Sequence, residues 1–254
     1  MKLNDLEKLR ASILIVHVAA ITGLVFLWDP SWLLISLFSY VSFLWLGHDL
    51  YYHRYLSHRS FYMPRWMQKV CSVLGIYCLF GTPIGIASTH VKHHGHSDTD
   101  KDPHPAKYPF AAWFWTYHQM EVRDRATVVR LSKDKWLCLI GRNYFVIYFF
   151  TILLAFIINP KIALYGFFIP AVYGFFSNGL VNVVCHKWGY KRYQTSDNAR
   201  NNLVVNVFLL FGGIALHNTH HAYPKSYILS RSWYEIDLVG AIAGCVNSLK
   251  KSDI

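Results

Sequence analysis

The chain has 254 residues, of which 54% are hydrophobic and only 15% charged, and its formal net charge is +11 with histidine neutral. This composition excludes a disordered chain, a collagen and a highly charged coiled coil, and the low charged fraction indicates a membrane protein. The five cysteines form no CxxC pair. We therefore expect neither a zinc ribbon nor a disulfide framework, and a reducing compartment fits best.

Four windows contain no Asp, Glu, Lys or Arg, and each is about as long as the roughly 20 residues that cross a hydrocarbon core. Tight turns at Asp29-Pro30 and Asn159-Pro160 join them in pairs, so they form two hairpins. The first window is not a signal peptide, because no cleavage site follows it. We expect one all-α membrane domain over 1–254 with four transmembrane helices, at residues 11–28, 32–52, 143–160 and 162–186.

A fifth uncharged stretch, 70–91, is interrupted by glycines and Pro83, and we expect that it does not cross. With four crossings, 24 of the 25 Lys and Arg residues lie on one side and Lys161 alone lies on the other. The positive-inside rule makes that side cytoplasmic. Both termini and a helical cap, formed by 53–142 and 187–254, are then cytoplasmic. The runs 203–216 and 238–249 are too short to cross and are expected in the cap.

The positive charge of this face has two interpretations. It sets the topology and attracts anionic lipid, and it also suits docking of an acidic redox protein or acyl carrier. The basic residues are scattered among membrane-flanking loops, without a recognisable nucleic-acid-binding module. We therefore expect no nucleic-acid partner.

Nine of the 14 histidines lie in three clusters and one outlier, all at or beyond the predicted cytoplasmic helix ends. In HVKHH and HNTHH the spacing i, i+3, i+4 spreads three imidazoles over about 100° of a helix, so that one triple can face one cavity. His53 and His58 would diverge by about 140° unless the helix ends or bulges there. Asn182 and His186, four residues apart, share a helix face.

Imidazoles in this number suit Fe, Zn or Cu, and nine are too many for one ion, so two metals are predicted. No carboxylate lies inside the histidine clusters, so a soluble carboxylate di-iron bundle is not indicated. His17 is expected to pack between helices. His48, five residues before His53, could be an extra ligand, but we expect it to contact the ligands rather than the metal. We expect His96, His104 and His118 to be solvated or to support the ligands.

The motifs HRYLSHRSF, HVKHH, NVVCHKWGY and HNTHHAYP resemble the histidine boxes of membrane fatty acyl desaturases of the stearoyl-CoA desaturase-like group. The resemblance runs from about residue 45 to 240. The segments 197–202 and 233–238 are also similar to bacterial members of this family. It implies two non-heme irons and O2 as co-substrate, with Asn182 acting through a bound water. The implied metal ligands are His53, His58, His90, His93, His94, Asn182, His186, His217, His220 and His221.

The resemblance implies insertion of a cis double bond into a long acyl chain carried on CoA, acyl carrier protein or lipid. The family usually has Gly-Glu-Gly-aromatic before its third box, whereas Gly213-Ile214-Ala215-Leu216 stands here, so a carboxylate behind the ligands is missing. A hydroxylase, acetylenase or decarboxylase would use the same ligands. The sequence has no cytochrome b5-like heme motif, so we expect a separate electron donor, either a ferredoxin or a cytochrome b5-like protein.

Two alternatives from other classes remain. A b-type heme electron carrier would need histidines that face each other inside the bilayer, where only His17 lies. A metal transporter would need polar or acidic residues along its crossings, which the four uncharged windows lack.

Overall fold

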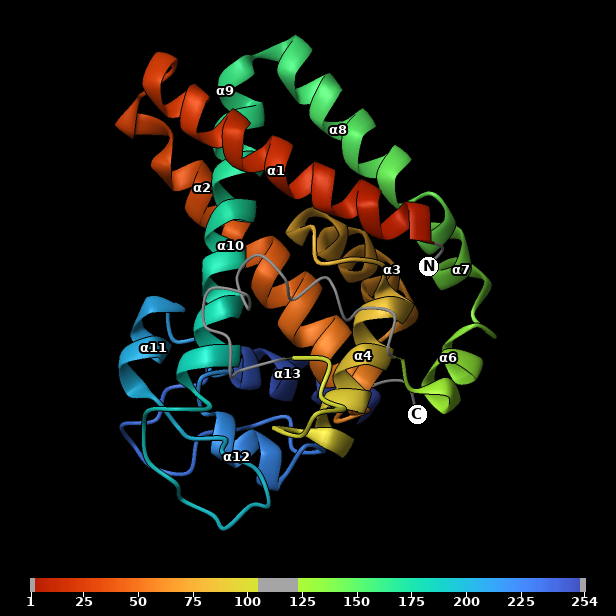
Figure 1. Ribbon diagram of the computed structural model, residues 1–254, viewed down its shortest axis with the longest axis vertical. Helices are drawn as coiled ribbons and strands as arrows, with labels where there is room; N and C mark the ends of the chain where they lie inside the picture. The colour runs from red at the N-terminus through yellow and green to blue at the C-terminus, as the bar shows by residue number, and fades with distance from the viewer. Residues whose placement is uncertain (1–2, 105–122, 252–254) are drawn as a thin grey trace.

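A computed structural model describes residues 3–104 and 123–251 of the chain, and they are built from helices (Figure 1). Within these residues, β pairing is limited to isolated bridges that join Tyr190 to Asn201 and Asn201 to Leu216. The prediction of an all-α chain is therefore confirmed.

The first hairpin consists of α1, Leu3–Phe26, and a continuous helix that runs from Pro30 to Ser57. This second helix begins as η1, Pro30–Trp32, continues as α2, Leu33–Tyr40, and ends as the π-helical segment η2, Val41–Ser57. Asp29 caps its start by accepting a hydrogen bond from the Ser31 backbone N–H. The helix ends five residues beyond the predicted boundary at 52.

The second hairpin consists of α8, Tyr144–Ile158, and a helix that runs from Pro160 to Val184. The segments of that helix are α9, Pro160–Ala163, η5, Leu164–Phe168, α10, Ile169–Gly179, and η6, Leu180–Val184. The turns of the two hairpins meet, because Lys161 Nζ lies 2.6 Å from Asp29 Oδ2. Figure 1 shows both turns at the same end of the molecule.

Among the described residues, three helices are long and apolar enough to cross a membrane: Glu7–Phe26, Pro30–Ser57 and Pro160–Val184. They coincide with three of the four predicted segments. The fourth predicted segment, 143–160, coincides with α8, which has only 15 residues. α8 meets the same criterion only together with α7, Lys135–Arg142, and the two helices are bent by 61° relative to each other.

The uncharged stretch 70–91 is broken at a bend. The helices on either side of the bend, Arg65–Cys78 and Pro83–His96, meet the membrane-spanning criterion together, so the absence of a crossing here stays a prediction. α3, Arg65–Leu74, continues as η3, Gly75–Cys78, and α4, Pro83–His96, then leaves at an angle of 79°. Thr82 caps α4 through its side-chain oxygen. η3 packs closely on the long helix, since a Cβ on Gly47 would lie 2.3 Å from the Gly75 backbone nitrogen.

The remaining helices are α6, Arg125–Leu131, α11, Leu203–Phe208, α12, His217–Ala222, α13, Leu238–Ser248, and η7, Leu249–Lys251. The predicted helical run 203–216 is thus helical only to Phe208. Helices α11, α12 and α13 gather at the end of the molecule away from the hairpin turns, beside the ends of α4 and α10 (Figure 1). All the histidine motifs therefore come together at this end.

Candidate metal centre

The nine clustered histidines converge in two adjacent groups, and within each group the candidate ligand atoms lie within 4.8 Å of one another. They come from the end of η2, from α4, from the turn after η6 and from α12. The five-histidine group consists of His53, His58, His90, His94 and His220. The four-histidine group consists of His93, His186, His217 and His221.

The π-helical winding of η2 brings His53 and His58 together. A π-helix bonds residue i to i+5, so side chains five residues apart share a face. Both residues are buried, and their ring centroids lie 5.0 Å apart. This confirms the prediction that His53 and His58 can meet only if the helix bulges or ends between them.

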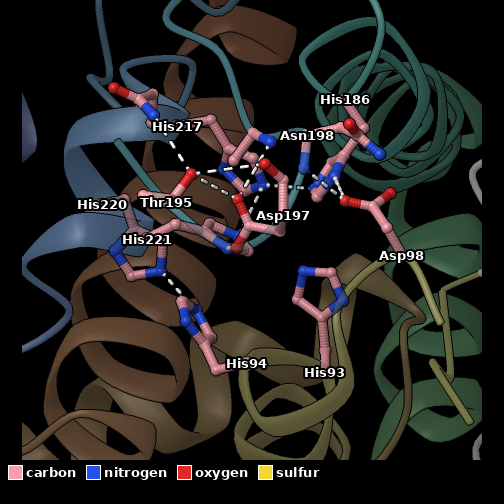
Figure 2. A network of polar contacts seen from close by, with 12 residues as sticks. His93, His94, Asp98, His186, Thr195, Asp197, Asn198, His217, His220 and His221 are labelled. Carbon is pink, nitrogen blue, oxygen red and sulfur yellow. Dashed lines mark hydrogen bonds and ion pairs between the residues drawn. The ribbon is translucent and has the colours of Figure 1, made fainter. Parts of the chain in front are cut away.

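Each HxxHH triple is divided between the two groups. His90 and His94 belong to the five-histidine group, whereas His93 belongs to the four-histidine group. In α12 the i, i+4 pair, His217 and His221, belongs to the four-histidine group. The third residue of that triple, His220, turns to the other group and lies 2.8 Å from His94, Nε2 to Nε2 (Figure 2).

Four carboxylates face the outer side of these imidazoles. Asp49, Asp102, Asp98 and Asp197 accept hydrogen bonds from the Nδ1 atoms of His53, His93, His186 and His221 at 2.8, 2.8, 3.0 and 2.6 Å. Such a bond fixes the proton on Nδ1 and leaves Nε2 as a lone-pair donor to a metal. The sequence reasoning missed this role, and only the i, i+4 spacing of Asp49 and His53 could have indicated it.

The nitrogen geometry fits bound cations. His186 Nε2 and His221 Nε2 lie 3.0 and 3.1 Å from His217 Nε2. Because the protons of His186 and His221 are held at Nδ1, His217 could donate a hydrogen bond to only one of them. His93 Nε2 is buried without a hydrogen-bond partner in the described residues. A metal with nitrogen ligands at about 2.1 Å would satisfy all four atoms.

Burial favours the neutral form of several of these imidazoles. Burial lowers the pKa of His220 and of His221 well below the ordinary value of 6.5, and neighbouring histidines lower it further. Burial, the largest single influence, would raise the pKa of Asp98, but the hydrogen bond and charge of His186 together with the Asn198 backbone N–H outweigh it and lower the pKa to about 2. Neutral imidazoles backed by carboxylates are the form that binds a transition metal.

Comparison with known proteins places this site in a family. Residues 28–244 match the family model described as fatty acid desaturase. The chain belongs to the fatty acid desaturase family. The family resemblance drawn from the histidine motifs is thereby confirmed.

Several desaturases are similar over most of this chain. An acyl-CoA 5-desaturase of Anemone leveillei is 30% identical over 87% of this chain and 70% of its own length. The Delta-9 acyl-lipid desaturase 2 of Arabidopsis thaliana is 29% identical over 92% and 77%. An sn-2 palmitoyl-lipid 9-desaturase of Nostoc sp. (strain 36) is 31% identical over 83% and 77%.

A cavity adjoins both histidine groups. Its walls include His53, His90, His217 and Asn182, together with apolar residues such as Ile86. A second cavity shares His48, Phe80, Asn178, Val181 and Ile214 with the first. It continues between the two long helices to Tyr40 and Ser177. Two small, mainly apolar cavities, which together we call the passage, thus lie between the histidine centre and the membrane helices.

The predicted site residues outside the histidine groups have clear places in the structure. Asn182 is buried and lines the cavity. His48 also lines it and packs edge-on against Phe80 at 4.9 Å between ring centroids. Ile214, which stands where the family usually has Glu, is another wall residue. The missing carboxylate is thus replaced by an apolar surface.

Three further histidines, His17, His104 and His118, are not among the predicted ligands. His17 packs edge-on against Phe175, with ring centroids 5.5 Å apart, which agrees with a packing role. The ring of His104 lies 4.8 Å from that of His93 and lines the cavity, so it supports the centre rather than facing solvent. His118 lies outside the described residues.

Proposed function

We propose that this protein is an O2-dependent fatty acyl desaturase that inserts a cis double bond into a long acyl chain through a histidine-ligated di-iron centre. The observation that carries the proposal is the convergence of nine imidazoles into two groups beside an apolar passage, in a chain of the desaturase family. Two irons, when bound, would activate O2, the oxidant, for the removal of hydrogen from an unactivated methylene.

The chain's own residues supply position, dryness and selectivity. The five- and four-histidine groups would hold the two irons, with Asn182 contributing through a water, and the carboxylates behind them fix each imidazole. Adjacent methylenes are chemically alike, so the shape of the passage must select the reacting carbon. Phe80, Val181 and Ile214 line the passage where its two cavities meet and would exclude water from the chain.

The relatives' names support an acyl chain attached to CoA or to a lipid as the substrate. An acyl carrier protein remains a further candidate carrier. We propose four membrane crossings as two hairpins, with α7–α8 as the bent third crossing and the histidine centre in a cytoplasmic cap with both termini. Electrons would come from a separate ferredoxin or cytochrome b5-like protein.

The decisive experiment is fatty-acid profiling of a desaturase-deficient host that expresses the chain, followed by mass spectrometry with purified protein, a reductant and acyl substrates. We expect a new cis double bond that is lost in His93→Ala and retained in His96→Ala. A hydroxylated product without an alkene would overturn the desaturase assignment in favour of a hydroxylase, and a triple bond or a shortened chain would favour an acetylenase or a decarboxylase.

A further inference from the structure

A third cavity, separate from the two at the histidine centre, lies where the long helix Pro30–Ser57 ends. It is a cleft of about 580 Å³ between that end, α3, α6, α7 and the last helical turns of α13 and η7. None of its wall residues lines the two cavities at the histidine centre. The walls include three cationic side chains, Arg59, Arg130 and Lys250, and one carboxylate, Asp134.

Arg59 is held in the cleft by an unusual backbone conformation. It follows His58 directly, and its φ of 55° lies in the left-handed region that non-glycine residues adopt at a cost. Its side chain is exposed, and within 3–104 and 123–251 no hydrogen bond or ion pair engages its guanidinium. The strained backbone thus presents an unpaired cation.

Arg130 lies close to Arg59. Its Nη2 donates a hydrogen bond to the Leu56 carbonyl oxygen at 2.8 Å, which anchors the guanidinium beside the same chain segment. Burial, and then the charge of Arg59, lower the pKa of Arg130, so the two cations repel each other across the cleft. An arrangement of like charges around an open space favours an anion between them.

The carboxylate of Asp134 does not neutralise this pair. Its two oxygens accept hydrogen bonds from Arg65 at 2.5 and 2.8 Å, and Oδ1 also caps α7 through the Trp136 backbone N–H. The charge of Asp134 is therefore matched by Arg65. Arg59, Arg130 and Lys250 leave the cleft with a net positive charge.

We propose that this cleft binds a phosphate ester, with the guanidinium groups of Arg59 and Arg130 as its main contacts. Two guanidiniums offer planar forks of N–H donors, which match phosphate oxygens better than a single ammonium does. The site is independent of the proposed metal centre. A bound phosphate would also fix the backbone at Arg59, immediately after the candidate ligand His58.

A membrane lipid headgroup and a soluble phosphate ester share this chemistry. α3, which forms one wall, exposes Trp66 and Val70, and an exposed Trp on a short amphipathic helix is typical of a membrane interface. A phosphate headgroup of a membrane lipid could therefore reach the cleft.

The test uses the full-length protein in a detergent that contains no phosphorus, with glycerol 3-phosphate as the soluble probe. Saturable broadening of its ³¹P resonance is expected. A second arm compares nanodiscs of phosphatidylcholine with and without phosphatidic acid, and measures whether the unfolding temperature rises with phosphatidic acid. A response in the first arm identifies a soluble ester as the source, and a response in the second arm alone identifies a lipid headgroup.

The matched variants are Arg59→Gln and Arg142→Gln, which remove the same charge from the cleft and from the exposed end of α7. Arg59→Gln should weaken binding about tenfold or more, because a charge-assisted contact is lost, and Arg142→Gln should leave it unchanged. Arg59→Lys should restore part of the binding. No response to either probe, or equal weakening by both Gln variants, would overturn the proposal.

Discussion

The Nδ1 atom of His53 donates a hydrogen bond to Asp49 Oδ1 at 2.8 Å, and both side chains are buried. Asp49 also accepts hydrogen bonds from Arg54 at 3.1 and 3.2 Å, and Arg54 in turn donates two bonds of 2.9 Å to Asp237. Asp237 caps α13 through the Gly240 N–H. The first histidine motif is thereby tied to the chain segment that follows the last one.

Asp49→Asn should loosen metal at the five-histidine group. The neutral amide oxygen holds the proton on His53 Nδ1 less firmly than the carboxylate does, and mutation of such a partner typically lowers metal affinity about 10- to 100-fold. Metal retained against a competing chelator measures the effect, with Asp134→Asn, remote from the centre, as the control. Because the substitution would also leave Arg54 with one carboxylate partner, thermal unfolding is measured in parallel. Unchanged affinity in a folded variant would contradict the assigned role.

Because each HxxHH triple is divided between the two groups, two double histidine variants should differ in the number of metal ions that they retain. The double variant His94→Ala/His220→Ala removes two ligands from one group, so about one metal ion per chain should be retained at the other. The variant His93→Ala/His94→Ala removes one ligand from each group, so both ions should be held more weakly. Metal per polypeptide after chelator challenge distinguishes them, with His96→Ala as the control. Identical profiles for the two double variants would refute the grouping.

Two glycine substitutions should have opposite effects on stability. Gly213 has a φ of +94°, and a Cβ there would lie 2.1 Å from Asp237 Oδ1, which would push that carboxylate away from Arg54. Gly213→Ala should therefore destabilise the protein by about 3 kcal/mol or more. Gly95 in α4 has open space around its Cβ position, so Gly95→Ala should stabilise by about 0.5–1 kcal/mol. Thermal unfolding in detergent measures both, and a neutral Gly213→Ala would contradict the packing described here.

The contact between the hairpin turns should depend on pH. The hydrogen bond from Lys161 holds the pKa of Asp29 at about 2, below the roughly 3.9 of an unfolded chain. A carboxyl with a lowered folded-state pKa stabilises the protein above about pH 4 and loses that contribution as the pH falls toward about 2. The unfolding temperature of Asp29→Asn should lie below that of the wild type at about pH 6, and the gap should close near pH 2. A gap that persists at this low pH would show that the ion pair is not its source.

Much of the candidate site could be predicted from residue types and spacing. The uncharged windows and the turns at Asp29-Pro30 and Asn159-Pro160 predicted the hairpins, because apolar length and turn chemistry are local properties. The nine histidines were identified as one candidate metal centre for a similar reason. Their spacing places them on helix faces, and an even number of crossings between the motifs places them at one end.

The sequence by itself identified the family of the protein and predicted imidazole ligands for two metals. Only the tertiary structure decided which imidazoles meet, because His94 and His220 are 126 positions apart and their contact depends on how α4 and α12 pack. It also decided the π-helical winding that turns His58 toward His53, and the carboxylates that reach Nδ1 atoms from distant loops, such as Asp98 on His186. These contacts form through long-range packing, which residue spacing along one helix does not encode.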